Sequence, residues 1–182
     1  MKRIFIFAIF LITLVAVLLG CSSPIPATPA PVDLSSLKLE PILIQSGDLP
    51  AGLNSGEISY NSIQTLLQND ISVPTPQNQI VQLLVSGGTT KGFIWLVLYD
   101  SESYVKLLYE DLIYGFVQSN VSKLNLNNGV EMTLSNSSGY FDLAFYKCNY
   151  VGYLRTPLND KFEATNYIER LSKRLDKILN CK

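Results

Sequence analysis

Three cysteines are among the residues of this sequence whose side chains could carry chemistry: Cys21, Cys148 and Cys181. A thiol can be acylated, oxidised to a disulfide or bound to a metal ion. The 182 residues include no histidine, so the commonest general base and metal ligand is absent. Cys148 and Cys181 are two ligands far apart in the sequence, which is fewer than a zinc site requires. The sequence therefore predicts no metal site and no cofactor.

The stretch that ends at Cys21 has the pattern of an export signal. Lys2 and Arg3 give it a basic start, and the residues from Ile4 to Leu19 are apolar except for Thr13. This apolar run is shorter than the ~20 residues that a membrane-spanning helix needs. A basic start followed by a compact apolar run is typical of a signal peptide.

The last residues of this stretch, Leu18-Leu19-Gly20-Cys21, resemble the lipobox of bacterial lipoproteins. In that motif the cysteine thiol is diacylglycerylated and the cysteine becomes the first residue of the mature chain. The resemblance implies that residues 1–20 are a lipoprotein signal peptide and that Cys21 is the lipidated residue. The protein is then expected outside the cytoplasm, anchored through Cys21 to lipid of the bacterial cell membrane. The alternative is an ordinary signal anchor in which the cysteine is incidental.

The segment that follows Cys21 is predicted to be a tether. In residues 21–38, prolines alternate with small residues, which favours an extended polyproline-like chain over a helix. Removing residues 1–20 leaves 12 basic and 15 acidic residues, a net charge of −3. This small negative charge gives no electrostatic footprint for nucleic acid. Residues 39–182 have a suitable length for one globular domain.

Once Cys21 is assigned to lipid, Cys148 and Cys181 remain as a pair. Export places a protein in an oxidising compartment in many bacteria, and an even number of remaining cysteines suggests a disulfide there. We therefore expect a bond between Cys148 and Cys181. The alternative is two buried free thiols.

Strands are predicted from runs rich in β-branched and aromatic residues. They are expected over residues 39–44, 80–85, 93–99, 129–134, 140–147 and 151–155. The run over 93–99 is apolar without alternation, so it is predicted to be a central strand that is covered on both faces. Residues 87–92, rich in glycine, are predicted to be a hairpin connection.

Helices are expected over residues 61–69, about 101–118 and about 161–180. The last helix has Asp160 and Glu163 at capping-box spacing. Its predicted apolar stripe consists of Ala164, Tyr167, Ile168, Leu171, Leu175, Ile178 and Leu179. Its basic residues near the C-terminus, Lys173, Arg174 and Lys177, are predicted to form a solvated face. The expected fold class is α+β: an antiparallel β-sheet flanked by helices, like an α/β/α sandwich, with a long C-terminal amphipathic helix.

Two further stretches resemble a family of poorly characterised bacterial lipoproteins. Gly47-Asp48-Leu49-Pro50-Ala51-Gly52 resembles the DLPxG turn of that family. The segment Ala144-Phe145-Tyr146-Lys147-Cys148-Asn149, followed by a strand and a Tyr-Ile-x-x-Leu helix that ends at Cys181, is similar too. The resemblance spans most of residues 40–181 and implies an α/β/α sandwich of the PsbP/Mog1 type. Its motifs are structural and imply no catalytic residues.

Motifs for catalysis are incomplete. Residues 87–92 include a lysine after glycines and threonines, but a strand follows where a phosphate-binding loop requires a helix. Ser103-Tyr104-Val105-Lys106 matches Ser-x-x-Lys without the other elements of penicillin-recognising enzymes, so a helix cap and an exposed lysine are expected. Glu57, Glu131 and Asp142 are carboxylates that could meet in space.

These observations favour an extracytoplasmic, non-catalytic binding or accessory module of the cell envelope. Its partner would be an envelope protein or a small ligand, and not nucleic acid. The alternative is a small hydrolase that uses carboxylates or a Ser/Lys pair, and the absence of histidine argues against it.

Overall fold

The computed structural model describes residues 32–43, 45, 48–49, 53–59, 74–116, 121–137, 139–157 and 161–181. The chain divides into two units, Met1–Pro31 and Val32–Lys182. The first unit, with the expected signal peptide and Cys21, lies outside the described residues, as does the helix expected over 61–69. Among the described residues, no helix is long and apolar enough to span a membrane.

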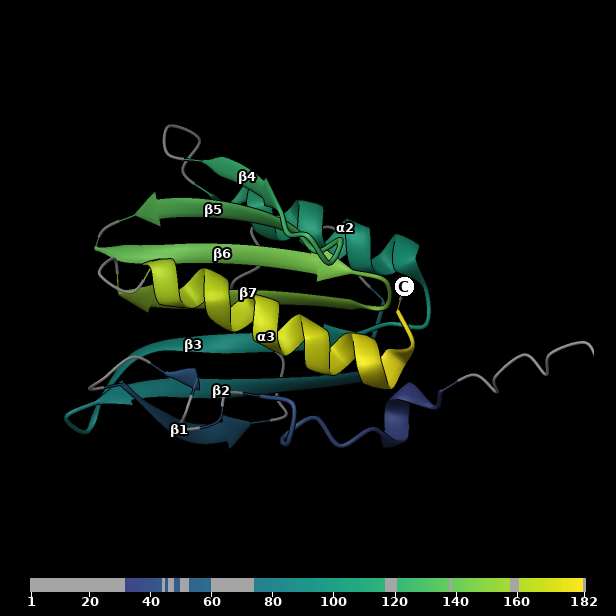
Figure 1. Ribbon diagram of the computed structural model, residues 1–182, viewed down its shortest axis with the longest axis horizontal. Helices are drawn as coiled ribbons and strands as arrows, with labels where there is room; N and C mark the ends of the chain where they lie inside the picture. The colour runs from purple at the N-terminus through teal and green to yellow at the C-terminus, as the bar shows by residue number, and fades with distance from the viewer. Residues whose placement is uncertain are drawn as a thin grey trace, which may run out of the picture. The chain divides into compact units, whose positions relative to one another are not determined.

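In the described part of the chain, seven strands form one sheet in the order β1-β2-β3-β7-β6-β5-β4 (Figure 1). Every neighbouring pair of strands is antiparallel. The strands are β1 (Asn54–Ser59), β2 (Asn78–Ser86), β3 (Thr89–Leu98), β4 (Ser122–Asn125), β5 (Glu131–Ser137), β6 (Tyr140–Lys147) and β7 (Tyr150–Pro157). The predicted α+β class with an antiparallel sheet is confirmed.

Two α-helices of the described part cover opposite faces of this sheet. α2 (Glu102–Tyr114) packs with Trp95 and Val97 of β3, and α3 (Lys161–Leu179) packs with Leu96 of the same strand. Successive side chains of a strand point to opposite faces, so the two helices lie on opposite sides. This explains why the strand over 93–99 is apolar without alternation, as predicted.

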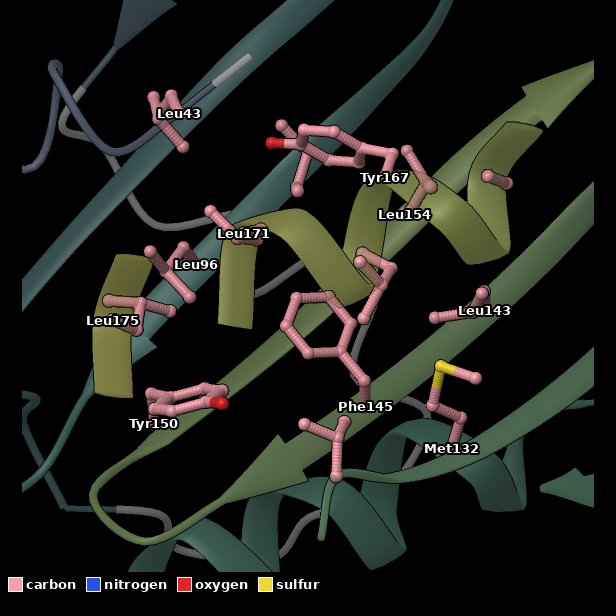
Figure 2. Packing of buried hydrophobic residues seen from close by; sticks show 14 of the residues in the cluster. Leu43, Leu96, Met132, Leu143, Phe145, Tyr150, Leu154, Tyr167, Leu171 and Leu175 are labelled. Carbon is pink, nitrogen blue, oxygen red and sulfur yellow. The ribbon is translucent and has the colours of Figure 1, made fainter. Parts of the chain in front are cut away.

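The core under α3 is the larger of the two. Figure 2 shows Leu171 and Leu175 of α3 together with Leu96, Phe145 and Tyr150 of the sheet. The helix stripe is buried from Ala164 to Leu175 as predicted. Ile178, which the predicted stripe included, is 37% exposed. Its neighbours in the last turn of α3 are also half-buried or exposed.

The strand predicted over residues 39–44 is wrong for the residues that the structure describes. The backbone N–H groups of Ile42 and Leu43 donate to the carbonyl of Leu39 at 3.0 and 3.3 Å, so this segment is a turn. Pro41 lies within it and has no N–H for a strand ladder. The apolar side chains are still buried, since Leu39, Ile42 and Leu43 belong to the core under α3.

Part of the predicted tether lies in the folded unit, which begins at Val32. Residues 34–36 form a short 3-10 helix, η1 (Leu34–Ser36), whose N-cap is Asp33. The side-chain amide of Asn78 donates to the carbonyls of Leu34 at 3.1 Å and Leu37 at 2.7 Å. These bonds fasten the segment to the start of β2.

Candidate functional site

The structure brings Cys148 and Cys181 together. Cys148 lies in the two-residue turn between β6 and β7, and Cys181 follows the end of α3. Figure 1 shows the C-terminal end of α3 beside the β6–β7 turn. Both are free, half-buried thiols, and their thiol groups hydrogen-bond each other. The sequence predicted the pairing, and the covalent bond itself stays a prediction.

The backbone has an uncommon conformation at Cys148 and at the residue before Cys181. Among the residues that the structure describes, Cys148 (φ 47°) and Asn180 (φ 55°) are the two non-glycine residues with positive φ. Asn180 ends α3 in a Schellman motif, because the N–H of Cys181 donates to the carbonyl of Asp176 at 3.2 Å. This reversal of the chain directs Cys181 back to the turn that carries Cys148.

The turn that carries Cys148 is held from the other side by β3. The backbone carbonyl of Asn149 accepts a hydrogen bond from the N–H of Tyr99 at 2.9 Å. The side-chain amide of Asn149 donates to the carbonyl of Tyr99 at 2.8 Å. These two bonds fix the turn against the end of β3, so the position of Cys148 is set by three strands.

Polar side chains connect the same turn to α3. Lys147 lies 2.7 Å from Asp176, and the two side chains are 9% and 16% exposed. The hydroxyl of Tyr150 donates to the other carboxylate oxygen of Asp176 at 3.3 Å. The thiol pair is therefore bordered by an ion pair that joins the same two elements.

The electrostatics of this site keep Cys181 protonated. Burial, together with the hydrogen bond and charge of Cys148, raises the pKa of the Cys181 thiol to about 12, against the lowering effect of the Asn149 backbone N–H. Burial and the neighbouring Asp176 raise the pKa of Tyr150 far above its usual value. Metal binding requires a thiolate. In the described part of the chain, no group of three or more Cys, Asp or Glu side chains could hold a metal ion.

A second polar cluster lies on the α2 face of the sheet. Asp142 of β6 is buried and accepts a hydrogen bond from the Tyr153 hydroxyl at 2.6 Å. The Nε atom of Arg155 lies 3.0 Å from the same carboxylate oxygen, and the Arg155 guanidinium stacks over the Tyr140 ring at 4.9 Å. Burial and the Asp142 carboxylate raise the pKa of Tyr153 far above its usual value. The Asp142 carboxylate therefore accepts hydrogen bonds from both Tyr153 and Arg155.

A third cluster corrects the prediction that Arg174 belongs to a solvated face. Arg174 donates to both carboxylate oxygens of Asp48, at 2.7 and 2.9 Å, and to the carbonyls of Ile42 and Leu43. Arg170 lies 3.4 Å from the same carboxylate. Sequence reasoning missed this contact because Asp48 and Arg174 are far apart in the sequence and carry no shared motif.

The carboxylates that could have met in space do not form one site. Glu57 lies on the edge strand β1, four strands away from β6 in the sheet order. Glu131 pairs with Tyr146 in the register of the sheet, whereas Asp142 pairs with Ser135. The Ser-x-x-Lys motif is a helix start, because Ser103 contacts the N-cap Ser101 and Lys106 binds Glu102 at 2.8 Å.

One buried carboxylate, that of Asp111, belongs to none of these three clusters. Asp111 is 1% exposed on α2, and within the described part of the chain neither of its carboxylate oxygens has a hydrogen-bond partner. The adjacent Glu110 is exposed, so these neighbouring carboxylates diverge as the helix geometry predicts.

Comparisons with known proteins give no family. No family model matches the chain, and no curated protein matches it. Among solved structures, the chain is similar to the crystal structure of a GTP-binding regulator from Thermotoga maritima, with 13% sequence identity and a TM-score of 0.44 over 78% of this chain and 87% of that chain. A similarity of this size assigns no function.

Proposed function

We propose that this protein is a lipid-anchored lipoprotein of the bacterial cell envelope, whose folded unit is a non-catalytic binding or accessory module. The observation that carries the proposal is the sequence Leu18-Leu19-Gly20-Cys21 at the end of a short apolar run. Lipidation of Cys21 would anchor the protein, because each buried methylene contributes about 0.8 kcal/mol and two chains hold stably.

The distance between Cys21 and the folded unit supports an anchored module. Residues 22–31 separate the lipobox cysteine from Val32, where the folded unit begins, and four of them are prolines. A polyproline-like chain rises about 3.1 Å per residue, so this spacer could extend by about 30 Å. Such a spacer presents the folded unit to a partner away from the bilayer surface.

The placement of the buried charges supports binding over catalysis. Asp48, Asp142 and Asp176 each bind an arginine or a lysine within the folded unit. These carboxylates hold elements of the fold together, which accounts for them without a catalytic role. The proposed partner is an envelope protein or a small ligand, and the net charge of the mature chain does not favour nucleic acid.

We also propose that the protein is related to bacterial lipoproteins that have a DLPxG turn and a PsbP/Mog1-like sandwich. It is supported by the antiparallel sheet with one helix on either face. The Asp of the turn, Asp48, binds Arg174 of the C-terminal helix, which gives this part of the motif a structural use.

A second candidate function is a small hydrolase. The buried carboxylate of Asp111 favours it, because a carboxylate without a partner is a feature of many catalytic sites. Asp142 is the other buried carboxylate on the α2 side of the sheet. Neither residue has a histidine that could serve as its partner base.

The two candidates are separated by one set of variants of the full chain. The native protein and Cys21→Ser are compared for their distribution between membrane and soluble fractions, and we expect only the native protein to remain with the membrane. The native protein, Asp111→Asn and Asp142→Asn are then tested on ester, peptide, glycoside and phosphoester substrates. If the native protein turns over a substrate and one of these variants folds but does not, the protein is a hydrolase and not a non-catalytic binding module.

A further inference from the structure

We propose that Cys148 and Cys181 form an intramolecular disulfide in the exported protein. The thiols already hydrogen-bond each other. Formation in the cell rests on the extracytoplasmic location proposed above, whereas the pairing rests on the geometry of the folded unit.

The fold holds the two sulfurs together from both sides. Cys148 is fixed in a turn with positive φ that Asn149 attaches to Tyr99. Cys181 is directed to that turn by the Schellman motif at Asn180. The Lys147–Asp176 ion pair joins the same two elements next to the thiols. Oxidation therefore requires no rearrangement of strands or helices to bring the sulfurs into contact.

Both sulfurs are available for the reaction, because both thiols are free and half-buried. A thiolate is the nucleophile in disulfide exchange, so the reaction begins at whichever of the two sulfurs first loses its proton.

The chemistry balances with a disulfide as the oxidant. One of the two cysteine thiolates attacks the oxidant, forms a mixed disulfide and releases the first thiolate of the oxidant. The other cysteine, as a thiolate, then attacks the protein sulfur of the mixed disulfide and releases the second thiolate. The protein loses two protons and two electrons, and the oxidant disulfide is reduced to two thiols.

The test uses the full chain and oxidised glutathione as the oxidant. The reduced protein is exposed to the oxidant, quenched with an alkylating reagent and mapped by mass spectrometry without reduction. We expect a linked pair of peptides that contain Cys148 and Cys181. In Cys181→Ser and in Cys148→Ser, glutathione should accumulate on the remaining cysteine, and no linked pair should form.

Protein isolated from the envelope, with its thiols blocked at lysis, completes the test. The linked peptides in that protein support the proposal. Two alkylated thiols in a protein that carries lipid on Cys21 would overturn the disulfide alone. An unlipidated protein that forms the bond with oxidised glutathione would overturn the anchor alone.

Discussion

At the scale of single residues, three acidic side chains of the folded unit, Asp48, Asp142 and Asp176, are each held by a basic side chain from another element. Asp48 lies before the sheet and Arg174 lies on α3, and their side chains are 7% and 28% exposed. Taking such charges out of water costs several kcal/mol per ion, and their attraction offsets that cost only when the geometry is good. Two contacts at 2.7 and 2.9 Å give this pair such geometry.

Removing one partner of this pair should destabilise the fold strongly. Arg174→Met leaves the Asp48 carboxylate buried without its main cation, and we expect a loss of about 3 kcal/mol in the free energy of unfolding. The matched control is Lys173→Met, which breaks an exposed pair with Glu169 and should cost less than about 0.5 kcal/mol. Urea unfolding measures both, and equal losses would show that Asp48 is not dependent on Arg174.

A tyrosine gives a prediction about alkaline pH. Burial raises the pKa of Tyr99 to about 12 from 10.0, so the folded protein keeps this proton after the unfolded chain has lost it. The stabilisation is therefore complete below pH 10 and is lost as the pH rises through 12. Tyr99→Phe should make stability fall less steeply in this range. It should also cost about 1 kcal/mol at neutral pH, because the hydroxyl donates to the Pro74 carbonyl.

The matched control is Tyr114→Phe, because Tyr114 is 67% exposed in the folded protein. Urea unfolding at several pH values from neutral to alkaline gives the slope for each variant. An unchanged slope in Tyr99→Phe would contradict the role of Tyr99.

At the scale of elements, a glycine of β7 makes room for a buried aromatic ring of the neighbouring strand β6. Gly152 of β7 lies opposite Phe145 of β6, and a Cβ atom at Gly152 would overlap the Phe145 ring. Phe145 is fully buried and contacts the Tyr150 ring at 6.5 Å between centroids. The ring of Phe145 thus fills the space over β7 that a side chain would otherwise occupy.

This packing predicts a coupled pair of substitutions. Gly152→Ala should destabilise the protein by about 1–3 kcal/mol, because the added methyl group overpacks the core. Phe145→Leu should also destabilise it, since it leaves a cavity. The double variant should be more stable than the sum of the two losses predicts, by about 1 kcal/mol. Chemical denaturation of the four proteins gives this coupling energy, and strictly additive losses would show that the methyl group does not contact the ring.

The elements that could be predicted from the sequence are those with strong apolar patterns. β2, β3, β5, β6, β7, α2 and α3 were each expected within a few residues of their observed bounds. β1 and β4 were missed, because Asn54–Ser59 and Ser122–Asn125 are mostly polar and exposed edge strands. Residues 39–43 show the reverse error, since an apolar run is buried there as a turn.

The candidate site could be predicted only in part. Counting cysteines paired Cys148 with Cys181, and the structure places them together. The ion pair of Lys147 with Asp176 and the binding of Asp48 by Arg174 depend on how α3 lies on the sheet. That placement follows from tertiary packing and is not encoded in any local pattern.

At the scale of the whole molecule, the disulfide would close a long loop. The loop from Cys148 to Cys181 includes β7 and α3. On the chain-entropy model, closing a loop of this length stabilises the folded protein by about 3.5–4 kcal/mol. We expect the free energy of unfolding in urea to be larger by this margin for the oxidised protein than for the reduced protein. A reducing agent should leave the free energy of unfolding of Cys148→Ser unchanged. An oxidised protein no more stable than the reduced one would show that the bond distorts the turn or the end of α3.

The folded unit is fastened to its own N-terminal segment on two elements. Asn78 of β2 binds the carbonyls of Leu34 and Leu37, and Arg174 of α3 binds the carbonyls of Ile42 and Leu43. The folded unit therefore holds its own N-terminal segment, and the proposed lipid lies on Cys21, ahead of that unit in the sequence.

The most direct measurement is the mass of the N-terminal peptide of the full-length protein expressed in a bacterium and extracted from its membranes. The account predicts that the mature chain begins at Cys21 and that this residue carries a diacylglyceryl group on its thiol. In Cys21→Ser the peptide should carry no lipid. A native chain that begins at another residue, or a Cys21 peptide without lipid, would contradict the account.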